Sequence, residues 1–284
     1  MEKGEVMLAG RIMATGSMIV YVAVTLPAQW SVTTKGVPMT PDGKPNLHAP
    51  APKMMDGRTP DLSGLWDVEK RPCIEATSPF GCSDALDGVP VGFINVTTGA
   101  NEAPPMLPWA EALVKQYADD ASLDPNLRCL PHAPSRMWVH FVMRKIVQIP
   151  DSLMILDEYM GQYRQIFLDG RPLPKDPEPM FKGYSVGRWE GDTLVVETIG
   201  IKENWFNGEG YPLTEQARII ERIRRWDYGN LEVEVTVDDP KAYMKPWTRT
   251  IKLTLVLDME PLEYICNENE KDLQIIINAG RARN

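Results

Sequence analysis

The residues best suited to chemistry gather in two stretches, Arg136–Ile149 and Asp157–Ile166. In the first, Trp138, His140 and Arg144 are separated by even numbers, so on a β-strand they share one face. Such a face suits an aromatic acid, because tryptophan stacks, arginine pairs with a carboxylate and histidine moves a proton. The alternatives are that His140 and Arg144 face water, or that His140 is a satisfied core residue.

The second stretch carries a phenol and a guanidinium side by side. Tyr163 could hold or deprotonate a substrate phenol, and Arg164 could anchor a carboxylate. Because neighbours on a strand point to opposite faces, only one of the two can point inward. Asp157 and Glu158 are better explained as the exposed rim of a hairpin.

A third stretch, "GYSVGRWEGDTLVVETIGI" (Gly183–Ile201), predicts a β-hairpin that turns at Glu190-Gly191-Asp192. It would add another wall to a binding site, and strand parity alone leaves open which face points inward. The candidate catalytic residues are His140, Tyr163, Glu197 and Arg164. The candidate substrate-binding residues are Trp138, Arg144, Tyr184, Trp189 and His132.

Other chemistries have weaker support in the sequence. The chain has no Gly-x-Ser-x-Gly elbow, no Gly-rich phosphate loop and no dinucleotide fingerprint. His132, His140 and a carboxylate could in principle hold a metal, but their spacing matches no standard signature. We therefore expect neither a metal nor a cofactor.

The elements that must position these residues read as strand after strand. A long strand is predicted over Arg136–Ile149, and further strands follow in hairpins to "LEYIC" and "LQIII" near the end of the chain. One helix is predicted over Pro108–Asp120. The pattern predicts an all-β fold, an antiparallel meander closed into a lipocalin-like β-barrel of roughly eight to ten strands.

The first 60 residues differ from the rest. Residues 1–28 are predicted to be a signal peptide, residues 29–60 a Pro-rich extended segment, and residues 61–284 a single β-barrel domain. The apolar run within the predicted signal peptide is short for a membrane span. We therefore expect a periplasmic or secreted protein with no stable membrane span after processing. An uncleaved anchor, or a start codon assigned too far upstream, is the alternative.

Charge and cysteine content narrow the possible partners and compartment. The net charge of −9 and the absence of a dense Lys/Arg stripe argue against nucleic-acid binding. Four cysteines allow three pairings, of which we favour Cys73–Cys82 with Cys129–Cys266. Four reduced thiols are the alternative if the leader is not a leader.

Several motifs together resemble a widespread bacterial family of exported, mostly hypothetical proteins: "PDLSGLW", "DPNLRCLP", "YRQIFLDGRPLPKDPEP", "GYSVGRWEGDTLVVET", "VDDPKAYMKPW" and "YICNENEKD". The chain is also similar to cofactor-independent decarboxylases of lignin-derived, phenylcoumaran-type acids. It departs from the family pattern at "CLPHAPSRM", where His132 replaces an apolar residue and Ala133 a glycine.

Two functions follow as hypotheses. The first is a cofactor-free lyase, most simply a decarboxylase, that acts by acid–base chemistry on a small aromatic or phenolic acid inside the barrel. The second is a periplasmic lipocalin-like binding protein for an apolar or aromatic molecule. The number of ionisable residues on inward faces favours the first hypothesis. The sequence leaves the oligomeric state open.

Overall fold

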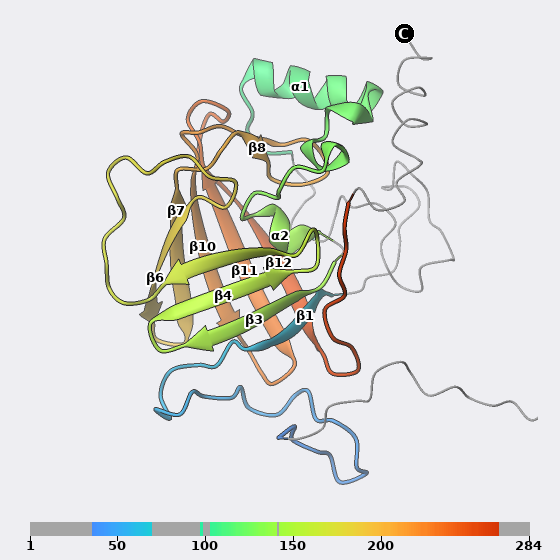
Figure 1. Cartoon of the computed structure of the whole chain (residues 1–284), viewed down its shortest axis with the longest axis vertical. Coiled ribbons are helices and arrows are strands. Elements are labelled where there is room, and N and C mark those ends of the chain that lie inside the picture. The colour runs from blue at the N-terminus through green and yellow to red at the C-terminus, as the bar shows by residue number, and fades with distance from the viewer. Residues whose placement is uncertain (1–35, 70–96, 99–102, 141, 267–284) are drawn as a thin grey trace, which may run out of the picture.

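The computed structural model describes residues 36–69, 97–98, 103–140 and 142–266 of the chain (Figure 1). The predicted signal peptide, the cysteines Cys73 and Cys82 and the predicted strand "LQIII" lie outside the described residues. Within the described residues, no helix is both long enough and apolar enough to cross a membrane.

Within the described part of the chain, nine strands form a closed β-barrel, so the predicted fold class is confirmed. They follow one another around the barrel in the order β1, β3, β4, β5, β6, β7, β10, β11, β12, and β12 pairs back with β1. The strands span Gly64–Val68 (β1), Arg144–Ile149 (β3), Ser152–Asp157 (β4), Gln162–Phe167 (β5), Tyr184–Glu190 (β6), Thr193–Ile199 (β7), Arg218–Arg225 (β10), Asn230–Asp238 (β11) and Trp247–Val256 (β12).

Strict alternation of apolar and polar residues decides which side chains fill the barrel. On β11, Leu231, Val233, Val235 and Val237 are all buried, as the alternation predicts. Side chains of this kind from every wall form one continuous core. Hydrocarbon side chains therefore fill much of the barrel interior, together with a few buried charged groups such as Arg164 and Glu221.

One pairing departs from a simple antiparallel meander. β5 and β6 run parallel and share only two residue pairs, Ile166 with Ser185 and Phe167 with Val186. The connection between them, residues 168–183, is long because parallel neighbours cannot be joined by a tight turn. Before Ile166 on β5 and Ser185 on β6 no ladder joins the two strands, so the barrel wall is open there.

The long strand predicted over Arg136–Ile149 is wrong in its first half. Arg136–Val139 forms a short helix, α2, and β3 begins only at Arg144. The Arg144 guanidinium donates to the carbonyls of Trp138 (2.9 Å) and His140 (2.7 Å), and so satisfies carbonyls at the C-terminal end of the helix. Apolar content alone did not distinguish this buried helix from a strand.

The remaining elements cover the ends of the barrel. Helix α1, Pro108–Asp119, confirms the predicted helix and lies across one end, and residues 36–63 run along the opposite end (Figure 1). Short strands complete the described chain: β2 (Thr97–Thr98) beside β12, and β8 (Asn204–Trp205) paired with β9 (Pro212–Leu213).

The end of the described chain is tied to the barrel without a strand. The predicted strand "LEYIC" is absent, and a single bridge joins Tyr264 to Tyr159. The predicted Cys129–Cys266 disulfide is confirmed. It holds the end of the described chain against the segment that leads into α2.

Candidate functional site

A buried ion pair crosses the barrel interior behind the opening between β5 and β6. The Arg164 Nη1 atom donates to Glu221 Oε1 at 2.8 Å, and Nη2 donates to Thr198 Oγ1 at 2.8 Å and to Glu221 Oε2. The Trp138 indole N–H also donates to Glu221 Oε1, at 2.5 Å. Arg164 and Glu221 are 1% and 0% exposed, so each charge depends on the other for its stability.

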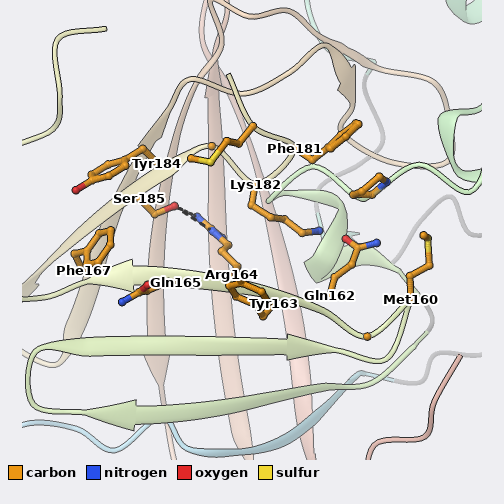
Figure 2. A pocket seen from close by; sticks show the side chains of 14 residues that line it. Met160, Gln162, Tyr163, Arg164, Gln165, Phe167, Phe181, Lys182, Tyr184 and Ser185 are labelled. Carbon is orange, nitrogen blue, oxygen red and sulfur yellow. Dashed lines mark hydrogen bonds between the residues drawn. The ribbon is translucent and has the colours of Figure 1, made fainter. Parts of the chain in front are cut away.

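A pocket of about 610 Å³ opens where the β5–β6 ladder is missing (Figure 2). The polar part of its lining includes Gln162, Arg164, Lys182 and Ser185. Pro131, from the segment before α2, also lines the pocket. Its apolar and aromatic lining consists of Met160, Tyr163, Phe167, Met180, Phe181 and Tyr184. Rings and thioethers around a few cations suit a small aromatic molecule that carries an acidic or polar group.

Two cations lie on the described lining of the pocket, Arg164 and Lys182. Arg164 is ion-paired with Glu221, whereas Lys182 forms no ion pair within 4 Å among the described residues. It follows the turn that begins at Met180, and its Nζ donates to the carbonyl of His132 at 2.8 Å. Burial lowers the pKa of Lys182, the Asp157 carboxylate opposes this and the Arg164 charge adds to it, and together these effects bring the pKa to about 7. At neutral pH the amine is therefore divided between its charged and neutral forms.

Asp157 is the acidic partner of this lysine. The side chain is 2% exposed, and burial raises its pKa to about 6, while the positive charges of Lys182 and Arg144 oppose the rise. Its Oδ1 accepts from the backbone N–H of Tyr159 at 3.2 Å. The two groups interact electrostatically, and each holds the pKa of the other closer to its ordinary value.

Two histidines lie behind Lys182 in a connected polar cluster. Burial, followed by neighbouring positive charges, holds the pKa of His132 and of His140 well below the ordinary value, so both are neutral. The Asn126 side chain bridges the two rings, with Oδ1 2.7 Å from His132 Nε2 and Nδ2 3.2 Å from His140 Nε2. Because Asn126 Oδ1 can only accept, the neutral His132 ring carries its proton on Nε2. Nδ1 is then an acceptor, and it lies 3.4 Å from Asp157 Oδ2, from which it can accept a hydrogen bond when that carboxyl is protonated.

The His132 ring is also fixed by stacking. It lies parallel to Tyr159, with the ring centroids 4.0 Å apart. The Tyr159 hydroxyl donates to the Asn126 carbonyl at 3.0 Å. Stacking and hydrogen bonding therefore hold the His132 ring in one orientation. The His132 carbonyl accepts from Lys182, and so connects the pocket lysine to this buried cluster.

The predicted site residues fall into three groups. Tyr163, Arg164 and Tyr184 line the pocket, although Tyr163 is 65% exposed on the outer face. His132, His140, Trp138 and Arg144 are buried behind the pocket.

Glu197 and Trp189 lie away from the pocket. Glu197 is on the outer face of β7 and pairs with Arg218, because Leu194, Val196 and Thr198 take the inner face. Trp189 packs against the core. The proposed shared wall of Tyr184, Trp189 and Glu197 is therefore not formed.

Sequence reasoning missed Lys182 and the burial of Asp157. Lys182 was not among the candidates, although it is a single cation within the apolar and aromatic run "MFKGY". The interpretation of Asp157 and Glu158 as an exposed rim is wrong, because they are 2% and 8% exposed. Glu158 is held by the backbone N–H groups of Met143 (3.0 Å) and Leu262 (2.7 Å).

Among the described residues, no group of three or more histidine, cysteine or carboxylate side chains is placed to hold a metal ion. No protein-family model matches the chain, and no curated protein is significantly similar to it.

Proposed function

We propose that this protein is a cofactor-free lyase of the decarboxylase type, acting on a small aromatic or phenolic acid bound in the β5–β6 pocket. The observation that carries the proposal is Lys182, an amine with a pKa near 7 on the lining of an aromatic and methionine-rich pocket. A group that titrates near neutral pH can both donate and accept a proton during one turnover.

The pocket lining suggests how a substrate would lie. Phe167, Phe181 and Tyr184 offer aromatic faces for the ring, and Tyr163 lies at the exposed rim, where its hydroxyl could contact a phenol. A carboxylate placed against Met180 and the rings would lose part of its hydration. Weaker solvation of the carboxylate favours its loss as carbon dioxide.

The chemistry balances without a cofactor for a para-hydroxyphenyl acid with a conjugated side chain. The phenol loses its proton to solvent at the open rim, and the side-chain carbon that bears the carboxylate gains a proton from the Lys182 ammonium, which forms a quinone methide. The bond to the carboxylate then breaks, and its electron pair restores the aromatic phenolate as carbon dioxide leaves. Lys182 regains its proton from solvent.

The test is direct. The protein is incubated without added cofactor with a panel of phenolic acids and lignin-type dimer acids, and masses are followed by liquid chromatography–mass spectrometry. We expect one class of substrate to lose the mass of carbon dioxide, with the same rate when a chelator is present.

Matched variants locate the reaction. Lys182→Gln should lower turnover by about a hundredfold, as expected for loss of a general acid. Lys145→Gln removes an exposed lysine that pairs with Glu260 on the surface, and it should leave turnover unchanged. Full turnover in Lys182→Gln would remove the pocket from the mechanism.

A binding protein without catalysis is the second candidate, and one observation favours it. Arg164 has its hydrogen bonds taken up by Glu221, Ser185 and Thr198, so this pocket cation is already neutralised. In that case an aromatic acid would raise the melting temperature without any change in its mass.

A further inference from the structure

We propose that the Lys182 amine is a nucleophile that forms an imine with the carbonyl group of an aromatic aldehyde or keto acid held in the β5–β6 pocket. This inference rests on the proposed function, because it takes the same pocket as the ligand site. It adds a substrate class, aromatic compounds that carry a carbonyl group.

The backbone around Lys182 fixes where the amine points. Gly183 adopts a φ of +60°, and its N–H donates to the Met180 carbonyl at 3.1 Å, which closes the turn. The Met180 carbonyl also accepts from Lys202 N–H at 2.9 Å, which anchors the turn to the segment after β7. Figure 2 shows the Lys182 side chain running from this turn toward the side of the pocket where Gln162 lies.

The hydrogen bonding of Lys182 is compatible with a neutral amine. Nζ donates to one carbonyl, that of His132. A neutral amine can make this bond and still present its lone pair to an electrophile. An amine held at one end in this way also loses little freedom when it attacks, which favours reaction over random encounter.

Burial and charge around the amine keep a usable fraction of it neutral. The pKa of Lys182 is lowered to about 7 by burial and by Arg164, against the raising effect of Asp157. His132, whose carbonyl accepts from Lys182, carries a neutral ring. An exposed lysine keeps only roughly one amine in a few thousand neutral at pH 7, so Lys182 should react far faster than a surface lysine.

The bond changes balance with no oxidant or reductant. The Lys182 nitrogen adds to the carbonyl carbon, and the oxygen becomes a hydroxyl. The hydroxyl then leaves as water together with the remaining nitrogen proton, and a carbon–nitrogen double bond forms. In a β-keto acid the protonated imine could next accept the electron pair released when carbon dioxide leaves.

The experiment traps the imine. The full chain is incubated with 4-hydroxybenzaldehyde, reduced with sodium borohydride, and read by intact mass and peptide mapping. We expect one benzyl adduct per chain, on Lys182, and at least a tenfold loss of labelling in Lys182→Gln. Lys145→Gln, which removes an exposed surface lysine, should label like the unaltered protein. Labelling spread evenly over the lysines, or unchanged in Lys182→Gln, would overturn the proposal.

A pH series adds a readout that does not depend on the folding of a lysine variant. Labelling of the unaltered protein should reach half its maximum near pH 7. In Asp157→Asn the midpoint should move to lower pH, because the carboxylate raises the pKa of Lys182. A midpoint near pH 10 in the unaltered protein would contradict the proposal.

A competing ligand separates the two proposals. A phenolic acid with no aldehyde or ketone group that raises the melting temperature of the unaltered protein but not of Lys182→Gln, with no aldehyde trapped, would retain the pocket and refute the imine. Trapping at Lys182 without any phenolic-acid binding would retain the imine and refute the proposed function.

Discussion

Arg164 and Lys182 line the same pocket and carry the same charge, but their environments give them opposite roles. Arg164 is enclosed by Glu221, Ser185 and Thr198 and stays charged in a closed network. Within the described part of the chain, the Lys182 amine donates to one group, the His132 carbonyl, and its pKa is lowered to about 7. We therefore assign the arginine to the architecture of the site and the lysine to its chemistry.

The Arg164–Glu221 pair predicts a strong effect of breaking it. Arg164→Met leaves the Glu221 carboxylate buried without its counter-ion and should lower the free energy of unfolding by about 3–5 kcal/mol. The double variant Arg164→Met/Glu221→Gln should recover part of that loss, because the glutamine oxygen still accepts from the Trp138 indole. Urea unfolding of both variants measures the difference, and equal losses in the two would contradict this account.

Lys182 predicts a pH dependence of stability with a definite sign. Its pKa is lower in the folded chain than in the unfolded chain, so between about pH 7 and pH 10 the unfolded state binds more protons. Over this range the unaltered protein should gain stability relative to Lys182→Met, by roughly 2 kcal/mol between pH 7 and 9. Urea unfolding at several pH values tests this, and a constant or falling difference would be inconsistent with a buried amine.

At the scale of elements, two departures from a regular barrel create the site: the short ladder between β5 and β6, and helix α2 in place of the start of a strand. The β5–β6 ladder has only two residue pairs, which leaves the wall open beside Arg164. Helix α2 replaces the start of the expected strand and brings Trp138 onto Glu221. A regular antiparallel barrel would close this wall.

The turn that carries Lys182 predicts an unequal effect of two glycine substitutions. Gly183 and Gly191 have nearly the same positive φ, +60° and +63°. A Cβ at Gly183 would lie 2.7 Å from the Ile199 carbonyl oxygen, whereas one at Gly191 would meet nothing within 4 Å. Gly191→Ala should cost about 1 kcal/mol from backbone strain alone, and Gly183→Ala at least about 1 kcal/mol more.

The measurement is urea unfolding of the two variants side by side, with aldehyde labelling of Lys182 as a second readout. We expect weaker labelling in Gly183→Ala, because the turn must shift, and unchanged labelling in Gly191→Ala. Equal stability and equal labelling in the two variants would show that the turn does not aim the lysine.

At the scale of the whole molecule, one covalent link ties distant parts of the chain together. Cys129 and Cys266 are 137 residues apart in sequence, and all of the barrel strands from β3 to β12 lie between them. The disulfide lies beside Tyr159, whose hydroxyl is 3.6 Å from Cys266 Sγ. It therefore closes the barrel strands into a loop next to the histidine cluster.

This long loop predicts a large effect of removing the disulfide. Cys129→Ala/Cys266→Ala should lower the free energy of unfolding by up to about 5 kcal/mol, because the unfolded chain gains the entropy of an open loop. Thermal unfolding in non-reducing conditions measures the loss. A loss of that free energy should lower the melting temperature by much more than a few degrees. A melting temperature within roughly two or three degrees of that of the unaltered protein would therefore contradict the prediction.

The sequence by itself determined the parts of this protein that depend on local periodicity. Strict alternation from Leu231 to Val237 identified both the strand and its buried face, and Gly191 marked the hairpin turn. These features are local because side chains alternate along any strand and because positive φ favours glycine. The closed barrel and a helix over Pro108–Asp120 were predicted from the same kind of pattern, whereas Cys129–Cys266 was a preference among three possible pairings.

Only the tertiary structure decided the site. The alternation of side chains along a strand predicts that Tyr163 and Arg164 face opposite ways. Arg164 is the one that points into the barrel because it pairs there with Glu221, which is 57 residues away in the sequence. Likewise, the apolar run "MFKGY" sets Lys182 apart locally, but it does not show which charges lie around the amine. Its low pKa arises from burial and from the charge of Arg164, against the raising effect of Asp157, and long-range strand pairing brings these groups around it.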